Sequence, residues 1–223
     1  MHLVDAAGSK TCPVTGCAGR APRTTGMKHP QLAPTHGPSG PLPDIMKPGL
    51  SAVFCGLNPG LRAAASGHHF AGHGNRFWRV IHLAGITDRE LEPVDDRQLL
   101  SYGYGLTTAV SRPTASAAAL SHNEYVDASV RLIIKLERFH PACVAFLGKA
   151  AYAAMTSQRV VPWGPQRRRM GGARVWVLPN PSGRNRAFSL AGLVDAYGEF
   201  RASVESQIRY GESPQCAEVD SLK

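Results

Sequence analysis

The chain has 223 residues, of which 43% are hydrophobic, and its 25 Lys and Arg outnumber 16 Asp and Glu to give a formal net charge of +9. This length suits one domain of ordinary size plus a tail. The chain has no apolar run near the ~20 residues that span a bilayer and no signal-peptide pattern, so we expect no membrane and a cytoplasmic location, with the nucleoid as the site in a bacterium. The excess of basic side chains favours a polyanionic partner, because neutralising phosphates releases condensed counterions.

Composition divides the chain into three parts. Residues 1–48 are rich in Gly, Pro, Thr and Ser and predict a flexible basic arm. The arm holds Cys12 and Cys17, which we interpret as reduced thiols because no further pair of metal ligands stands at a suitable spacing. A single domain is expected over residues 49–209, followed by a polar tail over 210–223.

Short apolar strands alternate with helices through the predicted domain. Strands are expected at residues 51–57, 104–110, 142–147 and 174–178. Helices are expected at residues 76–84, 92–102, 127–139, 150–156 and 190–208. This alternation predicts an α/β fold of three layers, with a short, mostly parallel central sheet and helices on both faces. The site of such a fold lies beyond the carboxyl ends of its strands, which indicates the loops at 57–60 and 179–186.

Both loops carry long motifs. The first region contains Gly56-Leu-Asn-Pro-Gly-Leu61, Gly67-His-His-Phe70 and Gly74-Asn-Arg-Phe-Trp78, and the second contains Val177-Leu-Pro-Asn-Pro-Ser-Gly183 followed by Arg184-Asn-Arg186. Ser111-Arg-Pro-Thr114 lies between them. A lone Asn-Pro-Gly would be a common turn. In this order, however, the motifs resemble those of the mismatch-specific uracil- and thymine-DNA glycosylases of the uracil-DNA glycosylase superfamily, over roughly residues 50–205.

The resemblance implies a base-excision repair enzyme. Such an enzyme flips uracil, and in some branches thymine or another damaged pyrimidine, out of mismatched DNA and hydrolyses the N-glycosidic bond to leave an abasic site. A monofunctional hydrolase is expected, because the motifs offer no Lys as a Schiff-base nucleophile. The expected partner is double-stranded DNA with a G·U or related lesion, bound by a monomer without metal or cofactor. The alternatives are a non-catalytic mismatch reader and a nucleotide-binding α/β protein, although the P-loop Lys and Gly-x-Gly-x-x-Gly of the latter are missing after the first strand.

Asn58 is the expected catalytic residue. Its neutral amide cannot act as a general base, but its carbonyl can accept a hydrogen bond from water and direct that water at the sugar. The resemblance implies this role, and an Asx-turn before Pro59 is the alternative. Thr107 matches a hydroxyl that helps hold the water, or is an ordinary strand threonine. Faster relatives carry an Asp near the position of Asn58, so we expect a slower enzyme here. Glu124 or Asp127 could supply an auxiliary acid, and the alternative is that these carboxylates only stabilise a helix start.

The resemblance also implies a pocket for the flipped base, formed by Leu57, His69, Phe70, Asn75 and Asn180. Phe70 matches a ring that stacks on the base, with core packing as the alternative. Asn75 matches a side chain that binds the pyrimidine edge, and it could equally cap the helix at 76–84. A neutral His69 could hold the leaving oxygen, or be a surface-loop histidine. Backbone N–H groups around Leu57 could stabilise the departing anion.

The second loop is expected to bind DNA. Ser182 and Gly183 match residues that contact the phosphates around the flipped nucleotide. Arg184 stands where the family inserts a wedge into the vacated base stack, with Arg186 two residues on, and an arginine there can donate to the widowed guanine. Simple phosphate contact is the alternative for both. Three consecutive arginines at 167–169 predict a phosphate clamp near this loop.

Overall fold

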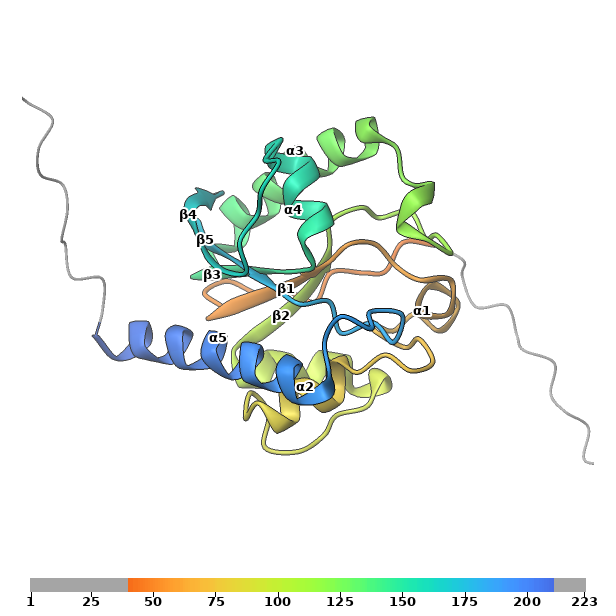
Figure 1. The fold of residues 1–223 in the computed structure, drawn as a ribbon. Coiled ribbons are helices and arrows are strands. Elements are labelled where there is room, and N and C mark those ends of the chain that lie inside the picture. The colour runs from red at the N-terminus through yellow and green to blue at the C-terminus, as the bar shows by residue number, and fades with distance from the viewer. Residues whose placement is uncertain (1–39, 211–223) are drawn as a thin grey trace, which may run out of the picture. The chain divides into compact units, whose positions relative to one another are not determined.

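A five-stranded sheet in the order β2-β1-β3-β5-β4 forms the middle layer of the computed structural model, which describes residues 40–210 (Figure 1). Strands β1 (Ala52–Gly56), β2 (Tyr104–Thr108), β3 (Cys143–Leu147) and β5 (Ala173–Leu178) are parallel, and β4 (Gly164–Met170) pairs with β5 in the antiparallel sense. Every residue of β1, β2 and β3 is buried, as expected of parallel strands covered on both faces. The predicted three-layer α/β fold is confirmed.

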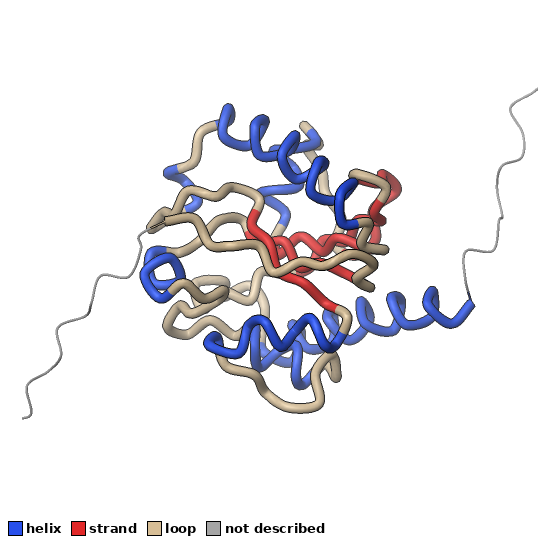
Figure 2. Tube along the Cα trace, turned by 180° about the vertical axis from the view of Figure 1, so that it is seen from behind, coloured by secondary structure: helices blue, strands red, loops and turns tan. Residues whose placement is uncertain are grey.

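Helices cover both faces of the sheet (Figures 1 and 2). One face packs against α2 (Phe77–Leu83), α5 (Leu190–Tyr210) and the 3₁₀ segment η1 (Pro93–Tyr102), and the other packs against α3 (His122–Phe139) and α4 (Lys149–Thr156). Two short helices, α1 (Leu61–Ser66) and the 3₁₀ turn η2 (Ala117–Ala119), lie in the connections. Within residues 40–210, no helix has the length and apolar character required to cross a membrane.

Adjacent side chains of β1 pack into the hydrophobic cores on the two faces of the sheet. Phe54 contacts the rings of Phe77, Tyr197 and Phe200, with ring centroids 5.3, 6.2 and 5.6 Å away. Its neighbour Cys55 points to the opposite face, into the cluster beneath α3 and α4. Because side chains alternate along a strand, one buried strand holds both helical layers in register.

Three local predictions were wrong. Strand β4 was missed because its sequence, with Pro165 and three consecutive arginines, has no alternation of apolar residues; charge and proline are typical of an edge strand. The helix expected at 92–102 is a 3₁₀ helix. Helix α3 begins at His122 rather than 127, because Ser121 and Glu124 form a capping box that starts it earlier.

The segment before β1 packs on the domain, earlier than the predicted boundary at residue 49. Ile45 is only 2% exposed and exchanges two backbone hydrogen bonds with Leu106, both 2.9 Å long. Leu42 is buried as well. The rest of the predicted arm, including Cys12 and Cys17, and the predicted tail beyond residue 210 lie outside the described residues.

Candidate active site

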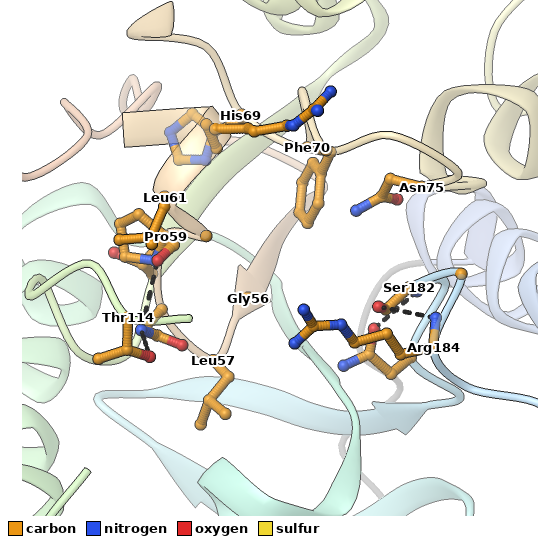
Figure 3. Close-up of a pocket in the computed structure, with 18 of the residues that line it drawn as sticks. Gly56, Leu57, Pro59, Leu61, His69, Phe70, Asn75, Thr114, Ser182 and Arg184 are labelled. Carbon is orange, nitrogen blue, oxygen red and sulfur yellow. Dashed lines mark hydrogen bonds between the residues drawn. The ribbon is translucent and has the colours of Figure 1, made fainter. Parts of the chain in front are cut away.

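A cavity of about 870 Å³ lies at the carboxyl ends of the parallel strands. Gly56, Thr108 and Leu147, the last residues of β1, β2 and β3, line its floor, and Asn180 follows β5 by two residues. This is where ligands bind in open α/β sheets. The structure therefore brings the loop after β1 and the loop after β5 to opposite sides of one cavity (Figure 3).

The Asn58 amide is fixed in one orientation. Its Nδ2 donates to the carbonyl of Arg112 at 3.0 Å, to Thr114 Oγ1 at 2.7 Å and to the carbonyl of Pro59 at 3.3 Å. Because carbonyls only accept, the nitrogen must face the loop. In residues 40–210 no donor to Asn58 Oδ1 is found, and no Asx-turn holds that oxygen. The carbonyl of a cavity-lining side chain is therefore available to a water molecule.

Phe70 presents its ring to the cavity from a strained backbone. Its φ is +58°, a left-handed conformation that costs a bulky residue on the order of 1 kcal/mol and that is concentrated at functional sites. The ring stacks on Phe77, with centroids 4.0 Å apart, and points toward Gly56 (Figure 3). A Cβ at Gly56 would lie 3.6 Å from the Phe70 ring. Phe70 therefore packs against the core through Phe77 and also lines the cavity.

His69 lines the cavity but has no hydrogen left to donate into it. The side chain is buried, and its Nε2 lies 2.9 Å from the carbonyl of Pro43, which can only accept. Burial lowers the pKa of His69, so the ring is neutral and carries its single hydrogen on Nε2. This arrangement leaves no His69 hydrogen for the predicted donation to a leaving oxygen. The residue instead anchors the segment before β1.

The amide of Asn75 serves two purposes. Its Oδ1 accepts the backbone N–H of Phe77 at 3.0 Å and so stabilises the start of α2, while its nitrogen points toward the cavity (Figure 3). In the same way, Asn180 Oδ1 accepts the N–H of Ser182 at 2.9 Å. Both asparagines line the cavity, and both commit their oxygens to backbone. Their remaining polar groups are donors, which suit carbonyl oxygens of a ligand.

Arg76 holds the second loop in place, a role that the sequence did not reveal. Its guanidinium donates to four carbonyls of that loop, those of Pro181, Ser182, Asn185 and Phe188, at 3.4, 3.2, 2.9 and 2.9 Å. Its backbone N–H also donates to Pro181. Arg76 lies within a recognised motif, but nothing in its spacing indicates partners more than a hundred residues away.

The two motif loops touch at a pair of glycines. A Cβ on Gly183 would lie 2.5 Å from the carbonyl oxygen of Gly74, closer than real Cβ contacts come. Because the obstacle is backbone, no side chain can move aside to make room. The loops can therefore meet only if residue 183 has no side chain.

Substituting Gly183 by alanine should displace both loops. We expect Gly183→Ala to lower the free energy of unfolding by about 1–3 kcal/mol, measured by urea denaturation. Gly198→Ala is the matched control, since a Cβ there meets nothing within 4 Å on helix α5 and alanine should stabilise that helix by about 0.5–1 kcal/mol. Equal stabilities of the two variants would contradict the contact.

Arg184 extends across the cavity in the structure (Figure 3). Its Nη1 donates to the carbonyl of Ala115 at 2.6 Å, on the loop that also orients Asn58. Ser182 Oγ accepts the backbone N–H of Arg184 at 3.3 Å. Arg186 is exposed and does not line the cavity. Of the two candidate arginines, the structure brings only Arg184 to the site.

Three predicted catalytic residues lie elsewhere. Thr107 is fully buried and its hydroxyl donates to Asp44 at 2.6 Å, so its neighbour Thr108 lines the cavity instead. Glu124 caps α3 and pairs with Arg112 at 2.7 Å; the hydrogen bond from Arg112 is the main cause that lowers its pKa to about 2. Asp127 is exposed on α3. The structure therefore does not bring these three residues to the cavity, and across residues 40–210 no carboxylate lines it.

The predicted arginine clamp is also misplaced. Residues 164 and 170, the ends of β4, pair with Val177 and Ala173 of β5, so arginines 167–169 lie toward the beginning of β5. Arg169 and Arg174 line a smaller cavity of about 430 Å³ at that end. The motif loops follow the opposite end of β5, and the clamp is therefore separated from them by the length of the strand.

The fold and the site together define an α/β protein with a cavity at the carboxyl edge of a parallel sheet, lined by an aromatic ring and asparagine amides. Residues 43–201 match the sequence profile of the uracil DNA glycosylase superfamily. The chain belongs to this superfamily and is a DNA glycosylase, a hydrolase that acts on DNA.

A solved structure supports the fold. The chain is similar to the solution structure of a candidate uracil DNA glycosylase from Methanosarcina acetivorans, with a TM-score of 0.53 and 21% sequence identity. The match covers 74% of this chain and 97% of the archaeal one. Nearly the whole of that protein therefore corresponds to the described domain.

Proposed function

We propose that this protein is a monofunctional glycosylase that flips uracil from G·U mismatches in double-stranded DNA and hydrolyses its N-glycosidic bond, acting as a monomer. The observation that carries the proposal is the fixed Asn58 amide, whose carbonyl is available at a cavity lined by the amides of Asn75 and Asn180. An acceptor for water thus shares one cavity with donors for a base.

The proposed chemistry follows from the charges that develop as the bond breaks. The sugar becomes positive and the departing base negative. Asn58 Oδ1 accepts a hydrogen bond from water and aims its oxygen at the sugar carbon, while amide N–H groups of Asn75 and Asn180 donate to the carbonyl oxygens of the base. The amino group of cytosine would place donor against donor and be rejected. Phe70 provides an apolar surface for the flipped ring.

The absence of a carboxylate among the described lining residues makes the reaction slow. No base withdraws the proton of the water in the transition state, a contribution typically worth about 10²–10⁴-fold. Positioning and leaving-group stabilisation must then supply the rate. A mismatched pair, which unpairs more easily, lowers the cost of flipping and favours G·U over paired uracil.

The proposal includes thymine in G·T mismatches as a poorer substrate. The cavity wall has several glycines, and a Cβ at Gly60 would meet nothing within 4 Å. Gly60 itself therefore leaves space in which an added methyl group could lie. Thymine differs from uracil only by that methyl.

Arg184 is the proposed wedge. It lies at the mouth of the cavity between the two motif loops, and its guanidinium can exchange the carbonyl of Ala115 for acceptors of the unpaired guanine. Ser182 and Gly183, immediately before it, would contact the flanking phosphates through the Ser182 hydroxyl and the Gly183 backbone N–H, because the Ser182 N–H is bound by Asn180.

The decisive experiment measures abasic sites formed in a G·U duplex, with an A·U duplex and an unmodified duplex as controls. We expect strand breakage only after alkali, and no borohydride-trapped protein–DNA adduct, because the lining residues within 40–210 include no lysine. A protein that binds the mismatch without forming abasic sites would be a reader rather than an enzyme. A trapped adduct would refute the monofunctional mechanism.

The orientation of Asn58 depends on Thr114. Thr114 is 7% exposed, accepts from Asn58 Nδ2 and donates to the carbonyl of Ser116 at 2.8 Å. Valine has a similar shape but cannot accept, so Thr114→Val should lower the single-turnover rate about 5- to 10-fold, the worth of roughly one hydrogen bond. Affinity for uncleaved DNA should be retained. Thr156→Val, which removes a hydroxyl bonded only within α4, is the control, and an equal rate in both variants would refute the role of Thr114.

A further inference from the structure

A cluster of aromatic and basic side chains lies beside the cavity. Lys149 Nζ stands 4.3 Å from the centroid of the Trp163 ring, and the ring of Phe188 meets Trp163 edge-on at 5.3 Å. Trp163 is 42% exposed, although tryptophan side chains are highly buried on average. Lys149 is the first residue of α4, Trp163 directly precedes β4, and Phe188 lies in the loop between β5 and α5.

The cluster is continuous with the second motif loop. Lys149 begins α4 directly after Gly148, where a Cβ would lie 3.4 Å from the Asn180 side chain that lines the cavity. Trp163 precedes Gly164, which pairs with Val177 near the end of β5. The carbonyl of Phe188 is one of the four that Arg76 binds. The same framework therefore positions the cluster and the cavity wall.

We propose that Lys149, held against Trp163, binds a phosphate of the DNA backbone beside the flipped nucleotide. This inference rests on the proposed function and extends its DNA contacts past the motif loops. A free lysine loses considerable side-chain entropy when it binds. The cation–π contact restricts the Lys149 side chain in advance while leaving its N–H donors for a phosphate. Trp163 and Phe188 then supply an apolar surface for the adjoining sugar.

Charge identifies DNA as the partner. No Asp or Glu occurs between Glu137 and Asp195, a stretch that supplies Lys149, Trp163, Phe188 and the whole second loop. Within this stretch no carboxylate can neutralise Lys149. A polyanion fits such a surface, and the neighbouring cavity requires DNA to lie across it.

The arginines of β4 provide a matched control. Arg168 lies on an exposed edge strand toward the opposite end of β5, within the same acid-free stretch. Neutralising either residue changes the net charge by one unit. A general electrostatic effect would therefore change both variants equally, whereas a phosphate contact would change only Lys149→Gln.

The experiment measures affinity for a G·U duplex made resistant to cleavage by a 2′-fluoro sugar, across a range of salt concentrations. Lys149→Gln should reduce the slope of log K against log salt by about 0.9 and weaken binding about 5- to 10-fold at low salt. Lys149→Arg should restore the slope, and Arg168→Gln should match wild type. Trp163→Ala should weaken binding by a smaller factor, because it removes the restraint on Lys149 and leaves the charge.

Duplexes shortened on one side of the lesion refine the test. The deficit of Lys149→Gln should vanish when the duplex no longer reaches the cluster, which identifies the flank that it binds. Equal slopes for Lys149→Gln and Arg168→Gln, in a wild-type protein that still releases uracil, would overturn this inference alone. A wild-type protein that binds DNA with the Lys149 effect but forms no abasic sites would overturn the proposed function alone. An acidic protein as the true partner would leave the DNA affinity of Lys149→Gln unchanged.

Discussion

Asn58→Ala is expected to reduce the single-turnover rate of uracil release from a G·U duplex by about 10²- to 10³-fold, comparable to the loss of one preorganised polar group in other enzymes. The physical reason is geometric. The Asn58 nitrogen is bound by the carbonyl of Arg112 and the hydroxyl of Thr114, so its oxygen is held still before the reaction begins. Alanine leaves the water without an acceptor to orient it.

The control for this experiment is Asn123→Ala, which truncates an exposed asparagine on α3. Its rate should equal that of wild type. Binding of the cleavage-resistant duplex by Asn58→Ala should stay within about threefold, since the removed oxygen contacts water rather than DNA. Rapid release of uracil by Asn58→Ala would show that another group activates the water.

Arg76→Lys is expected to disorganise the second motif loop. Lysine keeps the charge but cannot bridge four carbonyls with one planar fork. We expect a loss of about 2–4 kcal/mol in unfolding free energy, because hydrogen bonds to a charged group are lost and partly buried carbonyls remain unpaired. Affinity for the G·U duplex should fall more than about tenfold, because the loop carries Ser182 and Arg184.

Arg79→Lys is the matched control for Arg76→Lys. Arg79 lies three residues on, with its side chain exposed on α2. Its substitution should change the unfolding free energy by less than about 0.5 kcal/mol, as for most surface positions. Urea denaturation followed by duplex titration compares the two variants, and similar losses in both would contradict the organising role of Arg76.

The fold class was predictable because the strand sequences are continuously apolar, as expected of buried strands. The apolar runs around Phe54, Val144 and Val175 could only be parallel strands covered on both faces. The edge strand β4 was not predictable in this way. It is half exposed and basic, so its residues carry no pattern that separates strand from loop, and with it the arginines at 167–169 were placed at the wrong end of β5.

The site was predictable at the level of loops but not of partners. The motifs indicated Asn58, Phe70 and Asn75, yet the hydrogen bonds that orient the Asn58 amide come from residues 54 and 56 positions away. The hydrogen of His69 is taken by Pro43, in a segment predicted to be a loose arm. Thr107 and Thr108 differ by one residue on a strand, and that single step places their side chains on opposite faces.

The hydrogen bond from Arg184 to Ala115 affects how the enzyme would search DNA. In the free protein the proposed wedge lies across the cavity and is bound to the opposite loop, so an intact helix meets a side chain that is held against the protein. Releasing the guanidinium exchanges this exposed hydrogen bond for water at a cost of about 0.5–1 kcal/mol, which contacts with DNA can return. Insertion of Arg184 at any base pair requires this free energy. A mismatched pair is already weakened, so insertion would occur there more often than at a Watson–Crick pair. Recognition would thus begin as a kinetic filter, before any base has entered the cavity.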